Sequence, residues 1–350
     1  MSRYKNNQTV AIKVNKSDPG ILQQAKLEIF VLEQLRRLDP DRCNIVEWNG
    51  YFLDGERIYH HVVEAFLGEG GFGLVTRCRD TKNNQTVAIK VNKSDPGILQ
   101  QAKLEIFVLE QLRRLDPDRC NIVEWNGYFL DGERICLNFE LLDQSLWDYI
   151  GDRNNQGLPI TELRPILHQL ANALFHLGSV GIVHADLKPG NIMVVNRHES
   201  PIKVKLIDFG LAFPASALIP GYRVGTVGYC APEIMLGTSY DEAIDMWSLG
   251  LVAVELATGL PLYPGEDDYD VLKFIIETQG QLPDHLLESG LQGPENGQPF
   301  FVRLIKQMLA LDANQRITPS EVLKHPFFDT GLSRDSTPQP THLPLKMILK

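Results

Sequence analysis

The pattern of apolar and polar positions divides this 350-residue chain into a strand-rich part followed by a helical part. Apolar residues at helical spacing predict a helix over Ile98–Leu115, after a turn at Asp95-Pro96-Gly97. Short runs that alternate in polarity or are rich in β-branched residues predict strands. These strands lie at Val62–Leu67, Leu74–Arg79, Thr86–Val91, Ile122–Phe129 and Ile135–Leu141.

Beyond Leu146 the apolar spacing is mainly helical. The longest predicted helices cover Thr161–Leu177, Asp241–Thr258, Tyr269–Glu277 and Phe301–Leu311. A strand-rich small lobe followed by a helical large lobe indicates an α+β protein with a ligand cleft between the lobes.

A long internal repeat affects the strand-rich part. Residues 5–58 recur without a substitution at 82–135, which makes 54 identical positions at an offset of 77. Solenoid repeats diverge and need about three units to bury a core. A recent segmental duplication, or an error in gene or transcript assembly, explains the identity better. Only the second copy follows a glycine-rich segment, Leu67–Val75, and continues into the rest of the chain. We therefore expect the second copy to work and residues 1–61 to be a non-functional partial duplicate of the small lobe.

Composition narrows the class of protein. The formal net charge is 34 − 44 = −10, which is not the electrostatic footprint of a nucleic-acid binder. The five cysteines form no CxxC pair, which favours a reducing compartment over a disulfide framework. No signal peptide or membrane span is apparent. We expect a protein of the nucleus and/or cytoplasm that binds neither nucleic acid nor a membrane.

Two short blocks carry the candidate chemistry: HADLKPGN, which begins at His184, and DFG, which begins at Asp208. Two acidic residues, a lysine and an asparagine at this spacing can manage a phosphoryl group and its metal ions. We expect Asp186 to orient an attacking hydroxyl and accept its proton, and Lys188 to neutralise charge on the transferring phosphate. Asn191 and Asp208 are the expected ligands of Mg²⁺.

The glycine-rich segment is ambiguous by itself. The pattern GxGxxG also opens dinucleotide-binding folds, where a strand leads through it into a helix. Here it lies between two predicted strands, and the next landmark is VAIK, which ends at Lys90. That context favours a loop over the phosphates of ATP. A glycine hairpin without a ligand is the alternative.

Glu105 lies on the predicted helix, and an ion pair with Lys90 would hold the lysine on the α- and β-phosphates. The alternative for Glu105 is an ordinary solvated helix face, because other charged residues share this helix. Lys13 and Glu28 have the same spacing in the first copy, but no glycine loop precedes them. We interpret that second pair as having no role in the chemistry.

From about Val62 to Phe328 the chain resembles a eukaryotic protein kinase, and it is most similar to the homeodomain-interacting protein kinases of the CMGC group. The closer likeness rests on HADLKP at 184–189, EAIDMWSLG at 242–250, LYPG at 262–265, TQG at 278–280 and DANQRITPSEVLKHPF at 312–327. The resemblance implies a bilobal protein-kinase-like fold. Its expected parts are a small lobe at 62–141, a large lobe at 142–328 and a disordered tail at 329–350.

The resemblance also implies roles for single residues. The catalytic set is Lys90, Glu105, Asp186 and Lys188. The residues expected to bind ATP are Leu67, Gly68, Gly70, Gly73, Val75, Ala88, Lys90, Phe139, Glu140, Leu141, Met193 and Ile207. Glu233 is expected to pair with Arg316, Asp245 to brace the catalytic loop, and His184 to belong to the internal apolar packing.

The chain departs from the family pattern at three places. Ala185 replaces a common arginine, so a phosphate on the activation segment would lack its usual basic partner. Cys230 stands where the related kinases have an arginine, so neither proline-directed selectivity nor a tyrosine switch at Tyr222 follows from the resemblance. The segment between Gly280 and Phe301 is also shorter than the insert typical of this group.

Gly225-Thr226 with Tyr229 resembles the general serine/threonine kinase form instead, in which Thr226 hydrogen-bonds the catalytic loop. The resemblance therefore implies a monomeric protein serine/threonine kinase that uses ATP and Mg²⁺ on protein substrates, transcription regulators among them. Tyrosine autophosphorylation stays open. The alternative function is a catalytically silent kinase-fold module that acts by binding, because an extra half-lobe can compete with its identical copy.

Overall fold

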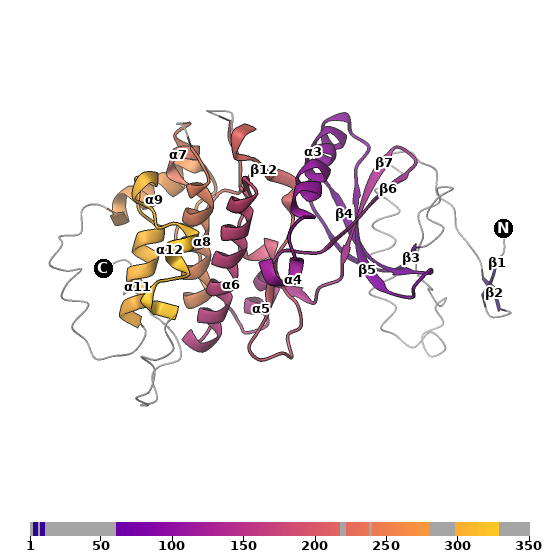
Figure 1. Cartoon of the computed structure of the whole chain (residues 1–350), viewed down its shortest axis with the longest axis horizontal. Coiled ribbons are helices and arrows are strands. Elements are labelled where there is room, and N and C mark those ends of the chain that lie inside the picture. The colour runs from indigo at the N-terminus through magenta and orange to yellow at the C-terminus, as the bar shows by residue number, and fades with distance from the viewer. Residues whose placement is uncertain are drawn as a thin grey trace.

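A computed structural model describes residues 3–5, 8–10, 61–217, 222–237, 240–279 and 298–328. The chain forms a strand-rich lobe and a larger helical lobe that lie side by side along the long axis (Figure 1). Two three-residue strands, β1 (Arg3–Lys5) and β2 (Gln8–Val10), pair with each other. The rest of the first copy, the short segment after Gly280 and the predicted tail lie outside the described residues.

The small lobe is built on a five-stranded antiparallel sheet with the strand order β3-β4-β5-β7-β6. Its strands are β3 (His61–Glu69), β4 (Gly73–Asp80), β5 (Thr86–Asn92), β6 (Trp125–Asp131) and β7 (Arg134–Glu140). Each predicted strand is present to within a few residues. β-Branched and apolar residues favour this pleated, half-buried surface, and Val87, Ile89 and Val91 of β5 are all buried.

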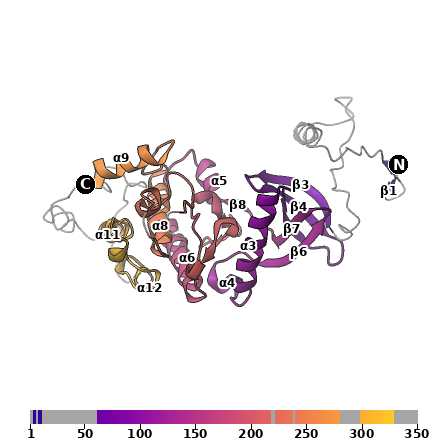
Figure 2. The same ribbon diagram turned by 90° about the horizontal axis from the view of Figure 1, so that it is seen from above.

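Helix α3 (Pro96–Leu112) packs beside the sheet on the side of the large lobe (Figure 2). Asp95 caps it by accepting hydrogen bonds from the backbone N–H groups of Gly97 and Ile98, at 2.9 and 3.3 Å. The predicted turn at 95–97 is therefore the first turn of the helix, and proline suits this position because its missing N–H is not needed there. A shorter helix, α4 (Pro117–Cys120), follows before β6.

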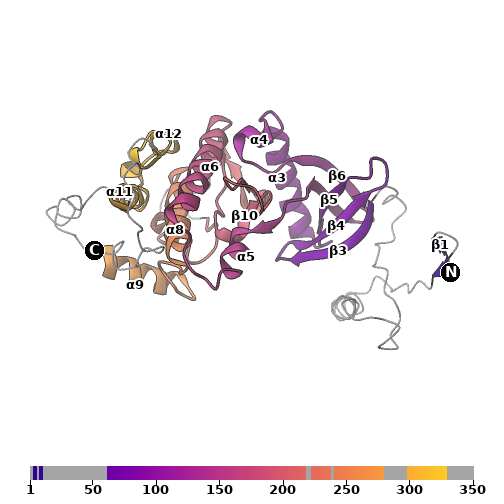
Figure 3. The same cartoon turned by 90° about the horizontal axis from the view of Figure 1, so that it is seen from below.

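The large lobe is helical, and its four longest helices match the predicted ones closely. Its helices are α5 (Leu146–Gly151), α6 (Ile160–Ser179), α7 (Pro232–Met235), α8 (Ala243–Thr258), α9 (Asp268–Gln279), α11 (Gln298–Met308) and α12 (Pro319–Val322). Figure 3 shows α6 and α8 in the middle of the lobe, with α11 and α12 on the far side from the sheet.

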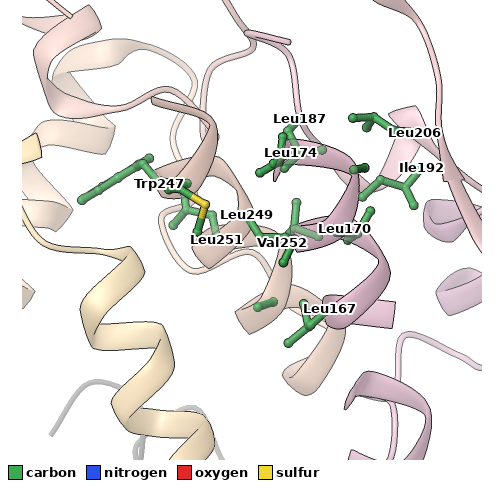
Figure 4. Close-up of a cluster of buried hydrophobic side chains, with 14 of the residues drawn as sticks. Leu167, Leu170, Leu174, Leu187, Ile192, Leu206, Trp247, Leu249, Leu251 and Val252 are labelled. Atoms are coloured by element: carbon green, nitrogen blue, oxygen red, sulfur yellow. The ribbon is translucent and has the colours of Figure 1, made fainter. Parts of the chain in front are cut away.

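Helix α8 is the centre of the core. Nearly all of its side chains are buried, as expected of a helix that is apolar on all sides. Leu249 and Val252 belong to the same buried cluster as Leu170 of α6 (Figure 4). Trp247 is fully buried and stacks on Tyr263, with ring centroids 6.4 Å apart. No helix in the described part of the chain has both the length and the apolar character of a membrane span.

Short strands bring the two motif blocks together. Strands β8 (Gln144–Ser145), β10 (Ile192–Val194) and β11 (Val204–Leu206) form a sheet with the order β11-β10-β8, and β9 (Ile182–Val183) pairs with β12 (Phe213–Pro214). The block at 184–191 runs from β9 to β10, and the block at 208–210 follows β11. β10 and β11 are antiparallel, and Ile192 pairs with Leu206. The block that precedes β10 and the block that follows β11 therefore lie next to each other at the same end of this sheet.

A buried ion pair joins two distant parts of the large lobe. The Arg316 guanidinium donates two hydrogen bonds to the Glu233 carboxylate, at 2.5 and 2.8 Å, and its side chain is only 1% exposed. We predict that Arg316→Met lowers the free energy of unfolding by about 3 kcal/mol, because it removes the cation that faces the buried Glu233 carboxylate. Denaturant unfolding measures this.

The matched control is Lys203→Met, since Lys203 pairs with Glu199 at 3.8 Å on the exposed surface. Its expected cost is below about 0.5 kcal/mol. Equal losses in the two variants would contradict a special role for the buried pair.

Candidate active site

Lys90 is the centre of an ion-pair network between the lobes. Its Nζ lies 2.8 and 2.9 Å from the two Glu105 oxygens and 2.8 Å from Asp208 Oδ1. β5 supplies the lysine and α3 supplies Glu105, whose side chain is only 2% exposed, so the solvated-face alternative for Glu105 is wrong. Burial disfavours the charged lysine, but the two carboxylates outweigh it and raise the pKa of Lys90.

The two carboxylates respond differently to this environment. Burial raises the pKa of Glu105 despite Lys90 beside it. Burial also acts to raise the pKa of Asp208, but the Lys90 ammonium overcomes it and the net shift is downward. Asp208 is therefore the carboxylate that stays ionised most readily, as a metal ligand requires.

The backbone at Asp208 turns its carboxylate into the site. Asp208 has φ 58° and ψ 80°, an uncommon left-handed conformation for a residue with a side chain. Phe209 points the other way into the core, where its ring packs edge-on against His184 with centroids 5.2 Å apart. Gln101 of α3, which the sequence reasoning missed, donates to the Gly210 carbonyl and ties the helix to this turn.

Asp186 lies among three polar side chains that converge on its carboxylate. Asn191 Nδ2 and Lys188 Nζ each lie 2.9 Å from Oδ2, and Thr226 Oγ1 lies 2.5 Å from Oδ1. Lys188 Nζ also donates to Thr226 Oγ1 at 2.7 Å. Thr226 thus accepts from the lysine and donates to the aspartate, which fixes all three side chains relative to one another.

Asp245 of α8 holds the loop that carries Asp186. Its two carboxylate oxygens accept the backbone N–H groups of His184 and Ala185, both at 2.8 Å. Burial raises the pKa of Asp245 even though these groups favour its charged form. Ala185 has φ 64°, and such strain persists only where the surroundings determine it. His184 is fully buried and donates from Nε2 to the Ile207 carbonyl, so it packs as a core residue.

We predict that Thr226→Val lowers kcat for the expected phosphate transfer about tenfold. Valine has nearly the shape of threonine but lacks the hydroxyl that joins Lys188 and Asp186. Thr226→Ser keeps the hydroxyl and should retain most of the rate. Steady-state kinetics with a saturating acceptor measures both variants. A Thr226→Val enzyme at the wild-type kcat would show that this contact is dispensable.

The predicted metal ligands have suitable chemistry. Asn191 directs its Nδ2 at Asp186, which leaves its amide oxygen as the available donor atom. Within the described residues, Asp208 uses Oδ1 for Lys90 and Gly210, while Oδ2 accepts no hydrogen bond. An amide oxygen and a carboxylate oxygen are hard ligands of the kind that Mg²⁺ prefers, so these two residues fit the ion.

The glycine loop joins β3 to β4 beside Lys90. Gly70 N–H donates to the Gly73 carbonyl at 2.8 Å and closes the turn. A Cβ on Gly73 would lie 2.1 Å from the Val91 carbonyl, so the fold itself requires that glycine. A Cβ on Gly68 or Gly70 would have nothing within 4 Å, so the protein leaves room beside the loop. Open backbone of this kind suits close approach to phosphates.

Apolar residues from both lobes form the expected nucleotide surface. Val75 pairs with Lys90 across β4 and β5, and Ala88 pairs with Phe139 across β5 and β7. Met193 of β10 lies in the large lobe. The apolar side chains of the predicted set that are half-buried rather than buried are Val75, Ala88, Phe139, Leu141, Met193 and Ile207, while Leu67 is 49% exposed. Their roles remain predictions.

Glu140 was predicted to bind the nucleotide, but its carboxylate is engaged by other groups of the protein. Its carboxylate accepts hydrogen bonds from Lys205 Nζ and from the Glu124 N–H, both at 2.6 Å. Lys205 of β11 is buried and lies 2.7 Å from Asp118 as well, so it links the end of β7 to α4. The Glu140 N–H donates to the Glu124 carbonyl at 3.1 Å, so this group is also engaged within the protein. The sequence signal for Lys205 was a lysine inside the apolar run before DFG.

Comparisons with known proteins identify the family that the chain resembles. A family model described as "Protein kinase domain" matches residues 61–328. Homeodomain-interacting protein kinase 2 of Mus musculus is 35% identical over 326 residues, which cover 76% of this chain and 27% of that protein. Homeodomain-interacting protein kinase 1 of Caenorhabditis elegans is 42% identical over 227 residues, which cover 65% and 27%.

The match to a third relative covers a larger share of that relative's length. Homeodomain-interacting protein kinase 4 of Homo sapiens is 31% identical over 344 residues, which cover 79% of this chain and 56% of that protein. The chain thus spans between about a quarter and about half of the length of these curated relatives.

Proposed function

The chain belongs to the protein kinase family, and from this premise we propose that it transfers the γ-phosphate of ATP to serine and threonine hydroxyls of proteins. One observation carries the proposal. Asp186, Lys188 and Thr226 share a closed set of hydrogen bonds of 2.5 to 2.9 Å beside the Lys90–Glu105 pair. Positioning and charge stabilisation of this kind are the main contributions that a protein makes to phosphoryl transfer.

Each residue of the site then has a step. Asp186 orients the acceptor hydroxyl and takes its proton as the new O–P bond forms and the bond to the ADP leaving group breaks. Lys188, held at 2.9 Å from Asp186, stabilises charge on the transferring group. Lys90, fixed by Glu105, aligns the α- and β-phosphates. Asn191 and Asp208 would hold Mg²⁺, which supplies further neutralisation of phosphate charge when bound.

The choice of hydroxyl rests on the Thr226–Lys188 contact. A lysine in the catalytic loop that bonds a threonine of the activation segment resembles the serine/threonine form of the family, and this supports such substrates. The names of the relatives associate those kinases with homeodomain proteins. We extend this to transcription regulators as substrates, and to a place of action in the nucleus and/or cytoplasm. We further propose that residues 62–328 are the working unit.

The test is transfer of phosphate from Mg-ATP to a generic basic protein by the whole purified chain, followed by mass spectrometry of the acceptor. We expect phosphoserine and phosphothreonine, with no product when Mg²⁺ is chelated. Phosphotyrosine alone on the acceptor would contradict the proposed specificity. Nucleotide binding without any transfer would favour the silent binding module.

A further inference from the structure

The segment between DFG at 208–210 and APE at 231–233, called the activation segment in kinases, is fastened to helix α9 by a bidentate ion pair. Arg223 Nε lies 2.8 Å from Asp268 Oδ2, and a second guanidinium nitrogen lies 2.7 Å from Oδ1. Fork-to-fork geometry of this kind is stronger and more directional than a single contact. Asp268 is the first residue of α9, where the helix dipole also favours a carboxylate. The Arg223 hydrogen bond lowers the pKa of Asp268, so the pair is ionised at neutral pH.

The same arginine reaches toward the catalytic residues. Its remaining nitrogen donates to the Gly225 carbonyl at 3.3 Å, directly before Thr226. Gly225 has φ 84°, and a Cβ there would lie 2.9 Å from the Ala185 carbonyl, so the segment runs against the catalytic loop at this point. Thr226 Oγ1 then meets Asp186. A continuous path of contacts joins Asp268 to the carboxylate of Asp186.

Other anchors of residues 222–230 are also side chains of the protein itself. Tyr229 donates to Glu255 at 2.6 Å, and Tyr240 donates to the Tyr222 carbonyl at 2.9 Å. Cys230 Sγ lies 3.2 Å from the carbonyl oxygens of Val224 and Thr226, either of which can accept its S–H.

The residue at position 185 fits this arrangement. An alanine in the catalytic loop has no charge with which to bind a phosphorylated segment. The Tyr222 side chain is 62% exposed, and its contribution to the anchoring is its backbone carbonyl rather than its ring. A segment that is ordered by the Arg223–Asp268 pair needs no phosphate group to be held against the catalytic loop.

We propose that the Arg223–Asp268 ion pair holds residues 222–230 against the catalytic loop in place of an activating phosphate, so that the enzyme works without phosphorylation of this segment. Arg223 and Asp268 are positioning residues, because they act on Asp186 through Gly225 and Thr226. This inference rests on the proposed function. It adds to that function the contacts that hold Thr226 and Asp186 in position.

The first test is the activity of the fully dephosphorylated chain. The protein is treated with a phosphatase, and intact-mass measurement verifies that no phosphate remains. We expect the initial rate of transfer to stay within about twofold of the untreated enzyme. A rate that falls with dephosphorylation and returns after phosphate is restored on Tyr222 or another residue of the segment would overturn the proposal.

The second test removes the ion pair. Arg223→Gln and Asp268→Asn should each lower kcat about fivefold while the KM for ATP stays the same, since the pair is half-exposed and lies away from the nucleotide. The double variant should lose no more than either single one, because both act through one contact. Asp268→Glu should recover part of the rate. Wild-type kcat in Arg223→Gln would overturn the proposal.

Arg153→Gln is the matched control. Arg153 has a similar exposure, 40% against 42% for Arg223, and pairs with Glu162 in the same lobe; within the described part of the chain, none of its hydrogen bonds or ion pairs reaches residues 222–230. Its expected kcat is that of the wild type. An equal loss in this variant would assign the effect of Arg223→Gln to general destabilisation.

A readout that needs no catalysis separates this inference from the proposed function. Hydrogen exchange of the backbone amides at 222–230 should speed up in Arg223→Gln and not in Arg153→Gln. If the wild type transfers no phosphate but shows this difference, the proposed function fails and the anchoring stands. If exchange is equal in all three proteins, the anchoring itself is wrong.

Discussion

Asp186→Asn is expected to lower kcat for phosphate transfer about 10³-fold, with little change in nucleotide affinity. The carboxylate of Asp186 accepts contacts from three donors, Lys188, Asn191 and Thr226. An amide in its place cannot take a proton from the acceptor hydroxyl, and general-base catalysis contributes on the order of 10² to 10⁴. Its NH₂ group would also face one of those donors. Single-turnover kinetics with saturating Mg-ATP measures the loss.

The same substitution at a distant site is the control. Asp312 caps a short helical turn by accepting the Asn314 N–H at 2.9 Å, and asparagine is an equally good cap. Asp312→Asn should therefore keep both rate and stability. Thermal unfolding of both variants checks that Asp186→Asn remains folded. Full activity in Asp186→Asn would remove Asp186 from the chemistry and with it the proposed mechanism.

Lys90→Met is expected to reduce the rate of phosphate transfer about 10²- to 10³-fold, because the lysine contributes both to the binding of ATP and to its alignment. The substitution also leaves Glu105 buried without its cation, which costs about 3 kcal/mol of stability. Nucleotide-binding and phosphate-transfer assays on the same preparation separate the loss of ATP binding from the loss of ATP alignment. The Lys90→Met, Glu105→Leu double variant should regain stability without regaining activity, because it removes the unpaired carboxylate as well.

The repeat supplies an unusually close control for this experiment. Lys13 has the same sequence neighbours as Lys90 for several residues on both sides, yet no glycine loop precedes it. Lys13→Met should transfer phosphate at the wild-type rate, and deletion of residues 1–58 should preserve or raise activity. If Lys13→Met is the inactivating change, the first copy occupies the site and our choice of copy is wrong.

Local patterns were enough to predict the elements of this fold. The runs that became β3, β4 and β5 alternate or are β-branched, and the long helices of the large lobe repeat apolar residues at helical spacing. These signals depend on side chains that are near one another in the chain, which is why they can be detected without a structure. The turn predicted at Asp95 was misjudged, because a capping aspartate followed by proline begins a helix as readily as it makes a turn.

The candidate site was only partly accessible to the same reasoning. Asp186, Lys188, Asn191 and Asp208 lie in two short blocks whose order and spacing carry the signal. Lys205 with Glu140, and Arg223 with Asp268, carry no comparable signal, because their partners are 65 and 45 residues apart. Nothing in a local pattern says which of the many charged residues will meet across such a distance.

The sequence by itself determined the class of fold, the family and the residues that we propose carry the chemistry, because each depends on short-range order along the chain. Only the tertiary structure decided how those residues are held. It showed that Gln101 ties α3 to the Gly210 carbonyl, that Glu140 faces Lys205, and that Arg223 reaches α9. The physical reason is that a buried or half-buried charge is stable only beside a partner, and the packing of distant elements selects that partner.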